Sequence, residues 1–134
     1  MGNATTTITG ENFEKTIEAG GIVVLDFWAS WCQPCRQFAP IFEKAATKHT
    51  DIVFGKVNTD EEQELSGAFQ IRSIPTIMIF REGILLLSQP GSMPPAVLED
   101  VISQVRALDM DEVRRKIAAQ KTENSGTPDG DAEA

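Results

Sequence analysis

The stretch that decides the fold is Val24-Leu25-Asp26-Phe27-Trp28-Ala29-Ser30-Trp31-Cys32-Gln33-Pro34-Cys35-Arg36. A nearly continuous apolar run, Ile22–Trp28, precedes the two cysteines, and such a run is typical of a strand covered on both faces. Beyond the cysteines, apolar residues recur with the spacing of one helix face. This face comprises Phe38, Ile41, Phe42, Ala45 and Ala46. The two thiols are therefore predicted to lie between a buried strand and the start of a helix.

Cys32 and Cys35 are the only cysteines of the chain, and two residues separate them. A thiol at the first turn of a helix faces unpaired backbone N–H groups and the positive end of the helix dipole, which lower its pKa. Cys32 occupies that place, while Cys35, one turn later, points inward. Because only a thiolate attacks a disulfide, this pattern predicts a redox switch that closes into a small ring and reopens.

Two other interpretations of the cysteine pair are a structural disulfide and half of a zinc site. A structural zinc site needs four ligands, and besides the two thiols the chain offers a single histidine, His49. We expect His49 to be a solvated residue at a helix end, and we expect no metal.

Strands alternate with helices along the rest of the chain, which predicts an α/β fold with a mixed sheet flanked by helices on both faces. The predicted strands are Thr5–Thr9, Ile22–Trp28, Ile52–Val57, Thr76–Phe80 and Ile84–Ser88. Four helices are predicted between these strands and after them. The first covers Glu11–Ala19 and the second follows the cysteines along the chain. The third follows a capping box of Thr59 and Glu62, and the fourth begins at Pro94-Pro95.

The C-terminal part is predicted to be an extension of this domain. Asp109 and Glu112 resemble a helix start, so we expect a short separate helix over Asp109–Gln120. Thr122–Ala134 contains no large apolar residue and is expected to be disordered. The predicted organisation is a domain at 1–108, a short helix at 109–121 and a disordered acidic tail at 122–134.

The 134 residues carry a net charge of −8, which disfavours binding to nucleic acids and to anionic membrane surfaces. No apolar run is long enough to span a bilayer. The N-terminal residues lack the features of a secretory signal, so we expect a cytoplasmic protein, where cysteine pairs are more often catalytic than structural.

Several separated motifs resemble the thioredoxin family, and bacterial-type cytoplasmic thioredoxins in particular. The stretch quoted above resembles the family's active-site segment, here with a Cys-Gln-Pro-Cys motif. Arg72-Ser73-Ile74-Pro75-Thr76 resembles the family's cis-proline loop. Pro40, Gly83 and Gly91 also stand at positions where the family has a proline or a glycine. The resemblance covers Thr5 to Leu108, so it implies a thioredoxin fold with a C-terminal helical extension.

The resemblance implies catalytic roles for four residues. Cys32 is expected to attack the substrate disulfide and Cys35 to resolve the mixed disulfide. Asp26 interrupts an apolar strand, so it is expected to be a buried acid whose raised pKa lets it exchange protons near neutral pH. Lys56, on the neighbouring strand, resembles its charge partner.

The resemblance also implies a flat, mostly apolar surface that binds substrates. Pro75 is expected to follow a cis peptide bond, and the backbone of Ile74 to pair with an extended substrate strand. The expected substrate-binding residues are Trp31, Gln33, Pro34, Ile74, Pro75 and Gly91. Trp28 is expected to pack under the site, and Pro40 to kink the long helix.

The implied activity is reduction of disulfides in protein substrates by dithiol–disulfide exchange. We expect a monomer with no bound cofactor, whose electrons come from NADPH through a thioredoxin reductase. A disulfide isomerase or oxidase, and a chaperone-like binding module, are the alternatives. Gln33-Pro34 replaces the family's commonest Gly-Pro, and the Gln33 amide could donate to a thiolate and make the pair more oxidising.

Overall fold

The structure is a computed structural model that describes residues 4–126. The chain divides into two compact units, Met1–Val101 and Ile102–Ala134. The first unit contains a sheet of five strands in the order β1-β3-β2-β4-β5. These strands are β1 (Thr5–Thr7), β2 (Ile22–Trp28), β3 (Val53–Asn58), β4 (Thr76–Arg81) and β5 (Ile84–Pro90).

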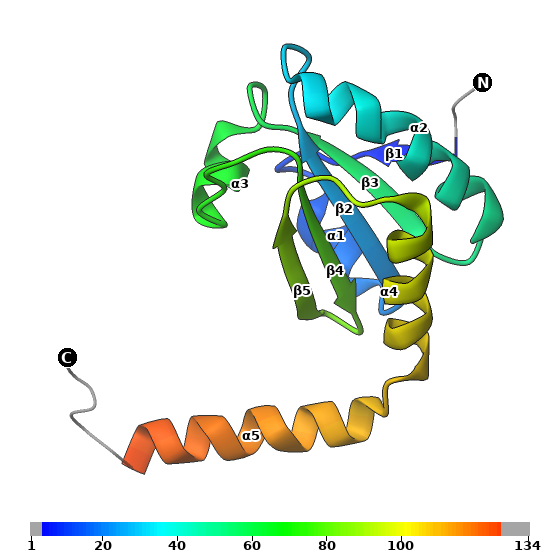
Figure 1. The fold of residues 1–134 in the computed structure, drawn as a ribbon. Coiled ribbons are helices and arrows are strands. Elements are labelled where there is room, and N and C mark those ends of the chain that lie inside the picture. The colour runs from blue at the N-terminus through cyan, green and yellow to red at the C-terminus, as the bar shows by residue number, and fades with distance from the viewer. Residues whose placement is uncertain (1–3, 127–134) are drawn as a thin grey trace. The chain divides into compact units, whose positions relative to one another are not determined.

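The sheet is mixed, as predicted. β3 pairs in parallel with β1 and β2, whereas β4 runs antiparallel to both β2 and β5. The helices are α1 (Phe13–Glu18), α2 (Gln33–Lys48), α3 (Gln63–Ala68), α4 (Pro95–Ala107) and α5 (Met110–Gly126). Figure 1 shows α1 and α2 on opposite faces of the sheet. The predicted helix behind the cysteines is α2, and Pro40 lies inside it.

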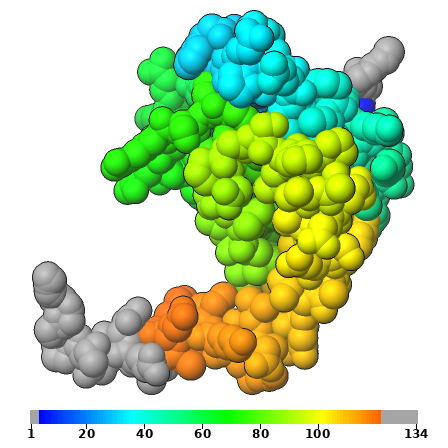
Figure 2. All heavy atoms as spheres, in the orientation of Figure 1, coloured from blue at the N-terminus to red at the C-terminus, as the bar shows by residue number. Residues whose placement is uncertain are grey.

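β2 is the central strand, and both of its faces are covered. Val23, Leu25 and Phe27 belong to an apolar cluster that also holds Ile17 of α1. Because side chains alternate along a strand, Asp26 faces the opposite side, where α2 packs. On that side the rings of Phe42 and Phe54 meet edge to face with centroids 5.3 Å apart. Figure 2 shows how little of β2 reaches the surface in this view.

The segment before α3 differs from the prediction. The capping box of Thr59 and Glu62 is absent, because α3 begins at Gln63 and its N-cap residue, Glu62, makes no side-chain cap hydrogen bond. The Thr59 hydroxyl instead donates to the backbone carbonyl of Trp28, at 3.2 Å. Asn58 organises this turn, since its Oδ1 accepts the backbone N–H groups of Asp60 and Glu61.

The C-terminal helix starts where the sequence predicts and ends later. Oδ1 of Asp109 accepts the backbone N–H groups of Asp111 and Glu112, at 3.0 and 3.2 Å, which is an N-cap arrangement. α5 then continues to Gly126, so the expectation that disorder begins at Thr122 is wrong for residues 122–126. The rest of the predicted tail, 127–134, lies outside the described residues.

Within the described part of the chain, no helix is long and apolar enough to cross a membrane.

Gly55 of β3 offers a test of the core. A Cβ at this position would lie 2.5 Å from Cγ1 of Ile8 and 2.9 Å from Cδ2 of Leu25, both buried. Gly55→Ala should therefore lower the free energy of unfolding by about 1–3 kcal/mol, as overpacking does. Urea denaturation measures this change.

Gly67→Ala is the matched control, because a Cβ there has no neighbour within 4 Å. Since alanine favours the helix over glycine, this variant should be stabilised by up to about 1 kcal/mol. Equal effects of the two substitutions would contradict the packing that we describe around Gly55.

Candidate active site: a disulfide at the start of α2

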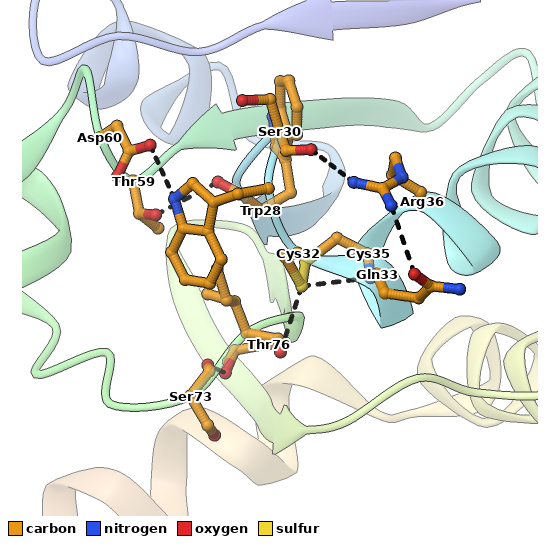
Figure 3. Close-up of a disulfide and its surroundings, with 12 residues drawn as sticks. Trp28, Ser30, Cys32, Gln33, Cys35, Arg36, Thr59, Asp60, Ser73 and Thr76 are labelled. Atoms are coloured by element: carbon orange, nitrogen blue, oxygen red, sulfur yellow. Dashed lines mark hydrogen bonds between the residues drawn. A yellow bond between two sulfur atoms is a disulfide. The ribbon is translucent and has the colours of Figure 1, made fainter.

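Cys32 and Cys35 form a disulfide at the N-terminus of α2, with their Cα atoms 5.2 Å apart (Figure 3). Cys32 is the N-cap residue and has an extended backbone, and the helix proper begins at Gln33. Pro34 stands in the first turn, where a missing N–H costs no helix hydrogen bond. The local sequence thus places both sulfur atoms in one turn and stiffens the backbone between them.

The start of α2 favours negative charge at Cys32. The backbone N–H of Cys35 points at Sγ of Cys32, at 3.2 Å, and the first turn of the helix contains no acidic residue. Unpaired N–H groups and the positive end of the helix dipole stabilise an anion there. In the dithiol form this environment promotes a Cys32 thiolate. Both cysteines are largely covered in the disulfide form, with 4% and 2% of their surface exposed.

Asp26 is buried in the middle of β2, with 1% of its surface exposed. Neither carboxylate oxygen has a hydrogen-bond partner among the described residues. Burial raises the pKa of Asp26 to about 7, because removal from water penalises the charged form, and the charge of Lys56 opposes this only in part. The carboxyl can therefore gain or lose a proton near neutral pH.

Lys56 is the register partner of Asp26 on the neighbouring strand β3. Its ammonium group lies over the ring of Trp28, 4.8 Å from the centroid. The cation is thus held by an aromatic face, and it acts on Asp26 through space. Trp28 is half-buried and packs against the cluster that contains both cysteines.

A groove of about 520 Å³ runs beside the disulfide. Four predicted substrate-binding residues line it together with Cys32: Trp31, Gln33, Pro34 and Ile74. The Trp31 side chain is prominent, with 66% of its surface exposed. Its indole Nε1–H donates to Oδ2 of Asp60, at 3.0 Å, and this bond fixes the orientation of the ring.

Pro75 and Gly91 lie next to this groove without lining it. The Ile74–Pro75 bond is cis, and the carbonyl oxygen of Ile74 lies 3.6 Å from Sγ of Cys32. The backbone N–H of Gly91 donates to the carbonyl of Pro75, at 2.7 Å. Gly91 has φ +97°, a conformation that glycine adopts without the strain of a Cβ.

The sequence did not identify every residue at this site. Asp60 and the groove residues Thr59, Ser66 and Ile71 were not predicted to lie at the site. Arg36, Arg72 and Ser73 were named only as parts of the two family motifs, without a role of their own. The position of Asp60 just after a strand parallel to β2 was a usable signal, because the carboxyl ends of parallel strands meet at one edge of a sheet.

A metal site requires several ligands close together. The described residues contain no group of three or more potential ligands that could hold an ion.

His49 is the C-cap residue of α2, but the expectation that it is solvated is wrong. Its side chain is 18% exposed, and Nε2 lies 2.7 Å from Oε1 of Glu99. A second groove of about 240 Å³, between α2 and α4, contains Pro40 and neither cysteine.

Comparison with known proteins agrees with this geometry. The thioredoxin family model matches residues 4–104. A Streptomyces coelicolor protein named as a candidate thioredoxin 2 is 52% identical over 120 residues, which cover 90% of each chain. A thioredoxin from Alicyclobacillus acidocaldarius is 40% identical over 103 residues, which cover 76% of this chain and 98% of that protein.

Solved structures show the same likeness. A mutant thioredoxin from Halobacterium salinarum superposes with a TM-score of 0.72 at 28% identity. The match covers 78% of this chain and 93% of that one. The chain therefore belongs to the thioredoxin family of thiol–disulfide oxidoreductases, with Cys32 and Cys35 spaced as its redox-active pair.

Proposed function

We propose that this protein reduces disulfides in other proteins. The observation that supports this most is the disulfide at the start of α2, where an N–H donor faces Cys32 beside an open groove. The Cys32 thiolate attacks one sulfur of the substrate disulfide and releases the other as a thiolate. Cys35 then attacks Sγ of Cys32, which frees the second substrate thiol and leaves the Cys32–Cys35 disulfide.

Asp26 is proposed to accept the proton that Cys35 must lose in the second step. A thiol with the ordinary pKa of about 8.5 is mostly protonated at neutral pH. A buried carboxyl with a pKa of about 7 is ionised often enough to take that proton and is basic enough to hold it. Lys56 is proposed to keep the pKa of Asp26 from rising further.

The groove is proposed to bind an extended segment of the substrate. Trp31, Pro34 and Ile74 offer an apolar lining, while the backbone of Ile74 is proposed to pair with the segment as a neighbouring strand does. Pro75 and Gly91 support that backbone through the hydrogen bond between them.

Thioredoxin-family proteins act on disulfide substrates and are usually reduced by a thioredoxin reductase. We propose the same electron supply here, with NADPH as the source, and a monomer that works in the cytoplasm. An oxidising or isomerising role would require a more oxidising cysteine pair. Equilibration with a glutathione buffer measures this property, since family potentials span from about −270 to about −120 mV.

Insulin reduction in the presence of dithiothreitol tests the proposed activity. The protein should accelerate precipitation of the insulin chains, and Cys32→Ser should abolish that acceleration because the attacking thiolate is lost. Cys35→Ser should instead trap mixed disulfides with protein substrates, visible on non-reducing gels, because attack remains while resolution fails. Trapping by the Cys32→Ser variant and none by the Cys35→Ser variant would reverse the two roles.

Asp26→Ala tests the buried carboxyl through the pH dependence of stability. The folded-state pKa is about 7, whereas the unfolded carboxyl titrates near about 3.9. Between these values the folded protein retains a proton that the unfolded chain has lost, so rising pH destabilises the native protein. The stability of the variant relative to the native protein should therefore increase by on the order of 3 kcal/mol from pH 4 to 7 and become level above about pH 8.

Urea denaturation at pH 4, 5.5, 7 and 8.5 measures this difference. Glu64→Ala, which removes an exposed carboxylate from α3, is the matched control. The cavity left by Asp26→Ala changes the free energy of unfolding by an amount that does not depend on pH. The test therefore uses the slope of the stability difference against pH. A difference that stays constant across this range would show that Asp26 is not the buried acid described here.

Truncation after Leu108 tests where catalysis resides. The family model ends at residue 104 and every residue of the groove precedes it, so the shortened chain should retain insulin reduction. A slight fall in the thermal midpoint is expected, because α5 is lost. Loss of activity in a truncated chain that still folds, as circular dichroism would show, would place part of the site in the extension.

A further inference from the structure

Arg36 connects the residues on either side of Cys32. It follows Cys35 in α2 and is exposed. Its guanidinium Nη1 donates to the backbone carbonyl of Ser30, at 2.8 Å, and Nη2 donates to Oε1 of Gln33, at 3.3 Å. The planar guanidinium of Arg36 thus connects Ser30, in the loop before Cys32, to the side chain of Gln33, which follows Cys32 (Figure 3).

This contact determines where the Gln33 amide lies. With Oε1 engaged, the amide is turned toward Arg36 and away from the sulfur of Cys32 (Figure 3). Gln33 still lines the groove. The donor that faces Sγ of Cys32 is the backbone N–H of Cys35, not the Gln33 side chain.

A released Gln33 amide would change the chemistry of Cys32. The amide carries two N–H donors, and a donor to the thiolate lowers the pKa of a cysteine. Stabilisation of the thiolate favours the dithiol over the disulfide and makes the pair more oxidising. The same side chain would also cover the approach that a substrate disulfide takes to the sulfur.

We propose that Arg36 is a positioning residue that keeps the Gln33 amide away from the sulfur of Cys32, so that the groove beside Cys32 stays open and the cysteine pair stays reducing. Arg36 acts through Gln33, while its bond to the Ser30 carbonyl fixes the guanidinium in place, and it need not touch the substrate. The expected effect of Arg36 on turnover of a protein substrate rests on the proposed reductase function. The expected effect on the redox equilibrium of the cysteine pair does not depend on that function.

Arg36 carries a positive charge that also acts on Cys32 through space, whatever Gln33 does. Arg36→Lys separates the two effects, because lysine keeps the charge but lacks the planar fork that reaches two acceptors at once. If Arg36 works through Gln33, the effect of Arg36→Lys requires the Gln33 side chain. The test is therefore a double-mutant cycle of Arg36→Lys and Gln33→Ala.

Two measurements on the cysteine pair give the coupling between Arg36 and Gln33. The equilibrium with glutathione gives its redox constant, and the pH dependence of Cys32 alkylation by iodoacetamide gives the pKa of its thiol. In the chain with Gln33, Arg36→Lys should shift the equilibrium about threefold toward the dithiol and lower the pKa of Cys32, a coupling of ordinary size for contacting residues. In the Gln33→Ala chain, Arg36→Lys should change neither quantity.

An equal shift in both chains would overturn the proposal, because Arg36 would then act through its contact with Ser30 and not through Gln33. Absence of a shift in both chains would overturn it as well. Neither measurement uses a protein substrate, so the result stands even if insulin reduction fails. With insulin as substrate, the Arg36→Lys chain should show a raised KM with little change in kcat, and Gln33→Ala should remove that rise.

Discussion

The pairing of β2 with a strand on each side is the constraint on which the site depends. Asp26 stands opposite Lys56 on β3 and opposite Ile77 on β4. A slip of one residue in either ladder would turn Asp26 to the other face of the sheet, into the cluster of Leu25 and Phe27. Because Cys32 follows β2 after a short loop, the same register also sets where α2 begins.

Much of this arrangement could be predicted from local pattern. The apolar run over Ile22–Trp28 gave both ends of β2 correctly, and its single carboxylate predicted a buried acid. Contacts between distant side chains could not be predicted in this way. The bond from Trp31 to Asp60 joins residues 29 positions apart, and the placement of Lys56 over Trp28 depends on rotamers that no periodicity encodes.

The errors have physical causes of the same kind. Thr59 and Glu62 match a capping box, but the Thr59 hydroxyl donates across to the carbonyl of Trp28 at the end of β2, and that tertiary contact takes precedence over the local cap. Composition predicted disorder from Thr122, yet α5 continues to Gly126. Residues without an apolar face can extend a helix that is already nucleated, because propagation is far easier than initiation.

Two titratable groups near α2 lie in opposite environments, and the reaction that we propose uses both. Cys32 receives an N–H donor at the positive end of a helix, which favours its thiolate. Asp26 receives no hydrogen bond from the described residues and little water, which disfavours its carboxylate. A carboxyl with good partners would be more stable but would titrate far below neutral pH, where it is too weak a base to take a proton from a thiol. The unsatisfied burial of Asp26 thus lowers stability and, on the role that we propose, suits it to the deprotonation of Cys35.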